Sequence, residues 1–132
     1  MYKLLQNQAV RDFHNEINDL GWDKACEQIP AVKAAMDVNF RGSELFTQDL
    51  VKYYTHVADL DVSDMDEAFH VHNIQDESKI TRYGTQHSMS VGDLLVAEDG
   101  GMYIVEGYGF GYVGNSVDEF EAGIERGMKE AV

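Results

Sequence analysis

The sequence predicts an α+β fold in which helices come first and a small antiparallel sheet follows. Apolar residues recur at helical spacing over residues 1–40, and residues 94–106 alternate around an Asp-Gly-Gly turn. The chain has 132 residues, 44% of them hydrophobic, which is enough to bury one core. We therefore expect a single domain over residues 1–132. It consists of a helical N-terminal part, an α+β part and a C-terminal helix, at residues 1–50, 51–116 and 117–132.

The N-terminal part is predicted to be a helical hairpin. Its first arm carries apolar residues at helical spacing, namely Leu5, Ala9, Val10, Phe13, Ile17 and Leu20. Gly21 stands where a glycine would end this helix, and Asp23 is a suitable cap for the next one. Pro30 must either break the second arm or open a new helical turn.

The α+β part is predicted to begin with a strand and a short helix. Residues 52–58 are β-branched and aromatic, and one face of this strand carries Tyr53, Thr55 and Val57. Ser63, followed by Asp66, resembles the capping box that opens a helix. The polar residues 73–87 predict a loop, in which residues 80–83 are compatible with a short strand.

A β-hairpin over residues 94–106 is the strongest local signal, because its Asp-Gly-Gly turn tolerates positive φ angles. Residues 107–113 continue as a glycine-rich aromatic strand, and Asp118 can cap a last helix. The strands need one shared apolar face. Five residues are therefore expected to be largely buried: Leu94, Val96, Ile104, Phe110 and Tyr53.

Residues 52–113 resemble a known family. The resemblance is carried by a strand, a short helix, a Ser-x-Ser-Val-x-Asp turn, a hairpin and a closing aromatic Gly-Phe. Here these pieces are residues 53–57, 63–69, 87–93, 94–96 and 108–110. The segment is similar to the YodL-like domain, a small module of plasmid, integrative-element and phage proteins, and the whole chain is similar to small uncharacterised proteins of tailed phages. The resemblance implies this fold and a mobile-element or phage context, and it implies no activity.

The charge and the cysteine content exclude several classes of function. The formal net charge of −14 opposes unaided binding of nucleic acid or of an anionic membrane. Residues 107–113 resemble an RNA-recognition octamer, but Glu106 occupies its basic position. Cys26 is the single cysteine, which excludes an intrachain disulfide and favours a cytoplasmic location. No apolar run approaches the ~18 residues of a membrane span.

Two acidic segments carry the main functional hypothesis. We expect a non-enzymatic protein that binds a host or phage protein through an acidic face. One form of this hypothesis is DNA mimicry, in which carboxylates take the place of phosphates in a cationic groove. The competing interpretation is a solvated surface that keeps a small protein soluble. The candidate residues are Asp59, Asp61, Asp64, Asp66, Glu67, Glu119, Glu121 and Glu125.

Ser88, Ser90 and Asp93 predict a turn in which their side chains bond to nearby backbone N–H groups. A catalytic interpretation, with His87 as the base for Ser88, lacks a third orienting residue. The alternative function is a small enzyme or ligand-binding domain with a pocket near His56 and His87. A pocket lined by both histidines and a carboxyl of shifted pKa would favour this alternative over the acidic face. A third interpretation is a virion or assembly component.

His70 and His72 are the remaining candidate metal ligands. On a helix, residues i and i+2 point in different directions, so these two side chains cannot bind one ion. We expect no metal and no cofactor, and the sequence predicts neither the identity of a partner nor the oligomeric state.

Overall fold

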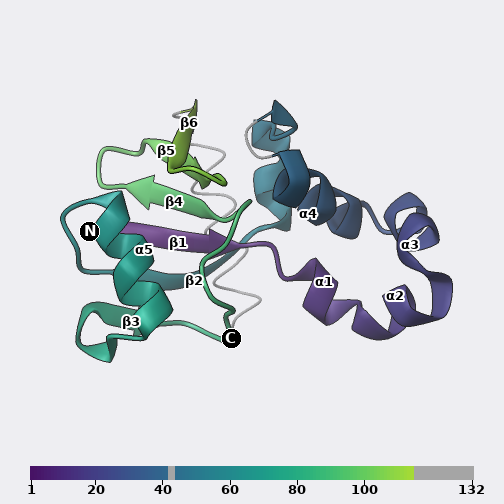
Figure 1. Cartoon of the computed structure of the whole chain (residues 1–132), viewed down its shortest axis with the longest axis horizontal. Coiled ribbons are helices and arrows are strands. Elements are labelled where there is room, and N and C mark those ends of the chain that lie inside the picture. Colours follow the sequence, from purple (N-terminus) through teal and green to yellow (C-terminus); the bar gives the residue numbers. More distant parts are fainter. Residues whose placement is uncertain (42–43, 115–132) are drawn as a thin grey trace.

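The computed structural model describes residues 1–41 and 44–114, and the helix expected after Asp118 lies outside them. Its fold is α+β, as predicted. Across the described residues, six strands form one antiparallel sheet in the order β3-β2-β1-β4-β5-β6 (Figure 1). The strands are β1 (Tyr2–Gln6), β2 (Thr55–Leu60), β3 (Ile80–Arg82), β4 (Leu94–Ala97), β5 (Met102–Val105) and β6 (Phe110–Gly114).

Strand β1 lies at the centre of the sheet, and this corrects the prediction that the first residues are helical. Both of its neighbours pair with it, so that Leu4 lies opposite Ala58 on β2 and Leu95 on β4. Leu4 and Leu5 are both fully buried, in the cores on opposite faces of the sheet. A short strand that is buried on both faces is a continuous apolar run, which periodicity cannot distinguish from the start of a helix.

Four short helices follow β1 and form a helical lobe beside the sheet, in place of the expected hairpin (Figure 1). They are α1 (Ala9–Asp12), α2 (His14–Leu20), α3 (Trp22–Gln28) and α4 (Pro30–Arg41). Gly21 ends α2 with a φ of 82°, and Pro30 opens α4, so both sequence signals are confirmed. Ile17, Ala25 and Val32 are buried together and give the lobe a small core of its own.

The two faces of the sheet are covered by different elements. Helix α5 (Met65–Ile74) lies over one face, where Ala68 and Val71 join the buried core. The 3₁₀ helix η2 (Gln48–Tyr53) and the end of α4 cover the other face. A second 3₁₀ helix, η3 (Glu77–Lys79), connects α5 to β3. No helix within the described ranges is long and apolar enough to cross a membrane.

Helix α5 begins one residue later than the predicted capping box. Asp64 is the N-cap residue, and its Oδ1 accepts a hydrogen bond from the Glu67 backbone N–H at 2.8 Å. The Glu67 carboxylate accepts in turn from the backbone N–H and the hydroxyl of Ser63. The arrangement is thus shifted by one residue from the predicted box, with Asp64 as the N-cap and with the Glu67 carboxylate bonded to Ser63, directly before it.

The hairpin of β4 and β5 is confirmed, whereas the burial of the five predicted core residues is confirmed in part. Leu94, Val96 and Ile104 are buried. Tyr53 and Phe110 are only half-buried. Residues 48–53 form the helix η2 rather than a strand, so the buried tyrosine is Tyr54, directly before β2.

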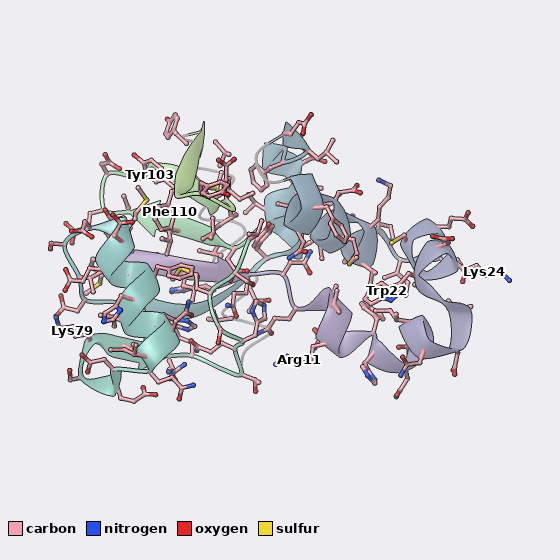
Figure 2. The ribbon with its side chains drawn as sticks, viewed as in Figure 1. Arg11, Trp22, Lys24, Lys79, Tyr103 and Phe110 are labelled. Atoms are coloured by element: carbon pink, nitrogen blue, oxygen red, sulfur yellow. The ribbon has the colours of Figure 1, made fainter. Side chains whose placement is uncertain are left out.

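The glycine-rich aromatic ribbon does not pack its aromatic rings into the core as a unit. Tyr108 is fully exposed and Tyr112 is 60% exposed, and Phe110 between them packs partly against the core (Figure 2). Tyr112 instead makes an edge-on contact with the Tyr103 ring of the neighbouring strand.

Candidate functional site

A pocket of about 430 Å³ lies between the helical lobe and the sheet. Small-molecule sites in proteins typically measure about 300–1,000 Å³. The residues that line it come from the β1–α1 connection, from α1, α2 and α4, and from the segments before β2 and β4. They are Asn7, Gln8, Val10, Arg11, His14, Ala35, Met36, Asn39, Tyr54, His87, Ser90, Val91, Gly92 and Asp93.

The pocket forms here because the chain leaves the sheet at its centre. Strand β1 ends at Gln6, and Asn7 immediately joins two helices of the lobe. The Asn7 side-chain oxygen Oδ1 accepts from the Ala9 backbone N–H at 2.9 Å, and the side-chain amide nitrogen donates to the Ala31 backbone carbonyl at 3.1 Å. The lobe is thereby held next to the sheet end where β1 stops and β4 starts.

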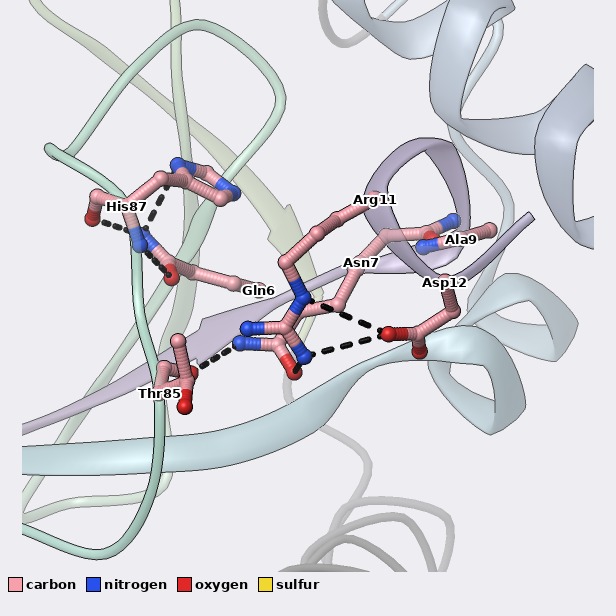
Figure 3. Close-up of polar contacts among 8 residues, drawn as sticks. Gln6, Asn7, Ala9, Arg11, Asp12, Thr85 and His87 are labelled. Atoms are coloured by element: carbon pink, nitrogen blue, oxygen red, sulfur yellow. Dashed lines mark hydrogen bonds and ion pairs between the residues drawn. The ribbon is translucent and has the colours of Figure 1, made fainter. Parts of the chain in front are cut away.

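Hydrogen bonds of the Gln6 side chain connect the turn before β4 to the end of β1. Its amide nitrogen donates to the His87 carbonyl at 2.8 Å and to Asp93 Oδ2 at 3.0 Å. Its amide oxygen accepts from the His87 backbone N–H at 3.2 Å (Figure 3). Gln6 is fully buried, so this amide pairs with the His87 backbone much as a neighbouring strand would.

Asp93 is the buried carboxyl group of the pocket, at 4% exposure. The structure places it in one turn with Ser90, whose backbone N–H donates to Asp93 Oδ2 at 3.0 Å. Burial raises the pKa of Asp93 to about 7, against the opposing effects of the His87 charge and of the hydrogen bonds from Ser90 and Gln6. Asp93 is therefore close to half-protonated at neutral pH.

The two Asp93 oxygens have different surroundings. Oδ2 accepts two N–H groups, from Gln6 and Ser90, so a proton on the neutral carboxyl belongs on Oδ1. Within the described part of the chain, Oδ1 makes no hydrogen bond, although Asp93 lines the pocket. The neutral carboxyl therefore presents an O–H donor to a ligand.

His87 lies beside Asp93 and is exposed. Its Nδ1 is 2.8 Å from the Ser88 carbonyl oxygen, which can only accept, and this contact favours the neutral tautomer with the proton on Nδ1. The same Nδ1 lies 3.3 Å from the Gln6 amide nitrogen, a longer contact that favours the other tautomer. No hydroxyl among the described residues is hydrogen-bonded to His87, and Ser88 contributes only this carbonyl. The site can bind and orient a polar group, but no nucleophile is aligned with a base.

His56 lines a second, neighbouring hollow of about 290 Å³, so the two histidines do not share one pocket as expected. Gln8 and Arg11 line both hollows and separate them. The Gln8 amide donates to the Thr85 carbonyl, and Arg11 is paired with Asp12 (Figure 3). The structure thus brings His87 and a carboxyl of shifted pKa together, and places His56 in the neighbouring hollow.

His56 and Tyr83 hold one of the predicted acidic residues in the fold. His56 Nε2 is 2.8 Å from Asp59 Oδ1, and the Tyr83 hydroxyl donates to Asp59 Oδ2 at 2.5 Å. Asp64 caps α5, and Glu67 forms an ion pair with Lys79 at 3.0 Å. These carboxylates have structural partners.

Asp61 and Asp66 are the two predicted acidic residues that are exposed and make no side-chain hydrogen bond or ion pair to the described residues. Glu119, Glu121 and Glu125 lie outside the described part of the chain. The structure therefore places only part of the proposed acidic face.

His70 and His72 lie on α5 and point to different surroundings, since His70 is exposed and His72 is 3% exposed. His72 contacts Gln86 Oε1 at 2.6 Å. Among the described residues, no group of three or more His, Cys, Asp or Glu side chains is placed to hold a metal ion. Cys26 is a free, half-buried thiol in α3.

Sequence reasoning singled out Asp93, Ser90 and His87 and a pocket near His87, but it missed Gln6 and Arg11. The polar Gln6 directly after two buried leucines was the available signal, because a buried amide needs partners. No protein-family model, no curated protein and no solved structure matches the chain, so the YodL-like resemblance stays a prediction.

Proposed function

We propose that this protein binds a small molecule in the pocket between the helical lobe and the sheet. The observation that carries this proposal is the Asp93 carboxyl, which is buried in the pocket wall and whose Oδ1 makes no hydrogen bond within the described residues. Among the interpretations of the sequence, this corresponds to the ligand-binding alternative.

The turn before β4 does not itself require an ionisable group. An asparagine at position 93 would accept the same two hydrogen bonds through its side-chain oxygen, without the cost of burying a charge. A residue that lowers stability without a structural need is typical of a functional site. This supports a role for the Asp93 carboxyl toward a ligand.

We propose binding rather than catalysis. The described residues of the pocket include no hydroxyl or thiol hydrogen-bonded to His87, which an activated nucleophile would require. The pocket and its donors are those of a recognition site.

A fragment library screened by ligand-observed NMR tests the proposal. Ala35 lines the pocket, and the substitution Ala35→Trp should fill it and abolish fragment binding. Gln28→Trp adds the same ring at an exposed position of α3 outside the pocket and should leave binding unchanged. Fragment binding that survives Ala35→Trp in a folded variant would contradict the proposal.

A second candidate is the acidic interaction protein, of phage or mobile-element origin and cytoplasmic location. It is supported by the net charge of −14 and by the exposed carboxylates of Asp61 and Asp66, which make no side-chain hydrogen bond within the described ranges. Its partner would be a host or phage protein with a cationic surface, and the protein alone would bind no nucleic acid.

Affinity capture from a host lysate separates this candidate from the first. A partner that is lost with Asp61→Asn/Asp66→Asn supports the acidic face. The control is Asp23→Asn/Glu27→Gln, which removes the same charge from exposed positions of α3. If the unmodified protein and both double variants capture the partner equally, the surface around Asp61 and Asp66 is not the binding surface.

A further inference from the structure

Basic side chains gather in the pocket, in contrast to the charge of the whole chain. Arg11, His14 and His87 line it, and Asp93 is the single acidic residue of its described lining. The chain as a whole has 24 acidic and 10 Lys and Arg residues. Basic groups in a concave, partly desolvated site attract anions locally, even on an acidic protein.

Two backbone acceptors of the pocket lining are engaged within the protein. The Val91 carbonyl accepts from the Asn39 amide at 3.2 Å. The Gly92 carbonyl accepts from the Tyr54 hydroxyl, which burial keeps protonated by raising its pKa. These two carbonyl oxygens therefore already have a donor within the protein.

Two hydrogen-bond donors of the pocket lining remain available to a ligand. Arg11 uses Nε and Nη2 to contact Asp12 and Gln8, and Nη1 makes no hydrogen bond within the described residues. The neutral Asp93 carboxyl adds its Oδ1–H. An excess of donors selects a ligand rich in acceptors, and a carboxylate is the compact group that accepts from several donors at once.

We propose that the pocket binds a small organic acid whose carboxylate accepts hydrogen bonds from Arg11 and Asp93. The apolar part of the ligand packs against Val10, Met36 and Val91, which line the same pocket. This inference rests on the proposed function and names the ligand class of that site.

The ligand carboxylate can be held by Asp93 only while Asp93 is protonated, because two carboxylates repel each other. The groups that surround Asp93 are His87, Tyr54, Ser90 and Gln6, and Arg11 lines the same pocket. With a pKa of about 7 for Asp93, the protonated fraction falls about tenfold between pH 6 and pH 8.

Three probes with the same ring test the ligand class: 3-phenylpropionate, 3-phenylpropionamide and 3-phenylpropylamine. Binding is measured by protein-observed NMR titration at pH 6 and pH 8. We expect 3-phenylpropionate to bind most tightly at pH 6 and to lose about tenfold in affinity at pH 8. The amine should bind at least tenfold more weakly than the acid at pH 6.

Asp93→Asn is the decisive variant, because its amide mimics the protonated carboxyl at every pH. It should bind 3-phenylpropionate at pH 8 about as tightly as the unmodified protein does at pH 6. Asp66→Asn, the same substitution on the exposed side of α5, should keep the original pH dependence. A purely structural role of Asp93 predicts no gain in affinity at pH 8.

Arg11→Ala should weaken 3-phenylpropionate binding about tenfold, whereas Lys24→Ala should not, since it removes the same charge from an exposed residue of α3 (Figure 2). An unchanged affinity in Arg11→Ala would overturn the proposal.

The outcomes separate this inference from the proposed function. If the amide or amine binds in the pocket more tightly than the acid, the ligand class is wrong and the proposed function stands. If no probe binds but fragments still occupy the pocket and are lost with Ala35→Trp, the ligand class alone is overturned. If neither probes nor fragments bind there, both are overturned.

Discussion

Gln6 and Asp93 lie 87 positions apart in sequence and share a buried hydrogen bond of 3.0 Å between the amide nitrogen and Oδ2. This contact joins the end of the central strand β1 to the turn that begins β4. The contact lies at the end of the sheet where the helical lobe begins, and Asp93 also lines the pocket. The protonation state of Asp93 therefore affects both the stability of the fold and the chemistry of the pocket.

Stability should fall as the pH rises through neutrality. Burial raises the pKa of Asp93 from 3.8 to about 7, so the fold favours the neutral form and loses stability once the unfolded chain ionises. Asp93→Asn should therefore match the unmodified protein near pH 4 in thermal unfolding. Its Tm should be several degrees higher at pH 8, since each pKa unit corresponds to about 1.4 kcal/mol.

The control for this pH effect is Asp66→Asn, whose carboxylate is exposed. Its Tm difference from the unmodified protein should not grow from pH 4 to pH 8. A difference for Asp93→Asn that stays constant over this range would show that Asp93 is ionised in the fold at all these pH values.

Gln6→Met should destabilise the protein by about 2 kcal/mol or more in urea unfolding. Methionine keeps the volume of the side chain, but it leaves Asp93 and the His87 backbone without their buried partner. Gln28→Met changes an exposed residue of α3 and should cost less than about 0.5 kcal/mol. Equal unfolding midpoints for the two variants would be incompatible with the Gln6 hydrogen bonds.

Leu94→Ala should destabilise the protein more than Phe110→Ala. Leu94 is fully buried between strands, and such substitutions cost about 3–5 kcal/mol. Phe110 is half-buried on the edge strand β6, so its loss should cost roughly 1–2 kcal/mol, less than a fully buried phenylalanine would. Denaturant titrations of both variants measure which substitution costs more stability. If Phe110→Ala cost more than Leu94→Ala, the glycine-rich aromatic ribbon would be packed more tightly than the exposure of Phe110 indicates.

The isolated protein should not bind single-stranded RNA or duplex DNA at physiological salt. Tyr108 is fully exposed and could stack on a base, but the net charge of −14 repels phosphates. A fluorescence-anisotropy titration checks this. Binding that weakens steeply with added salt would instead identify the ribbon as a nucleic-acid platform.

Local signals in the sequence were sufficient where the structure depends on neighbouring residues. The turn between β4 and β5 was predictable because its geometry is set by Asp99, Gly100 and Gly101, and Gly100 has a φ of 89°. The contact of Ser90 with Asp93 likewise spans only three positions. Strand β1 was not predictable in this way, because Leu4 and Leu5 are buried by partners distant in sequence.

The candidate site likewise combines features that neighbouring residues determine with features that depend on distant residues. Asp93 and His87 were recognised within one short motif, as members of a turn and as a candidate base. Nothing local links Gln6 to that motif, and the relation between His56 and His87 depends on how the lobe and the sheet are packed. Pockets between elements are determined by tertiary packing, which periodicity does not encode.

The central position of β1 also affects the order in which the protein folds. Its partners on β4 are Leu94 to Ala97, about 90 residues later in the sequence. During synthesis, β1 therefore cannot pair with β4 until several seconds after β1 itself has been made. The helical lobe needs only contacts between nearby residues and can form early, whereas the sheet closes late because of its long-range pairings. The pocket is completed only when both have formed, so a chain stalled before β4 would carry a folded lobe and no binding site.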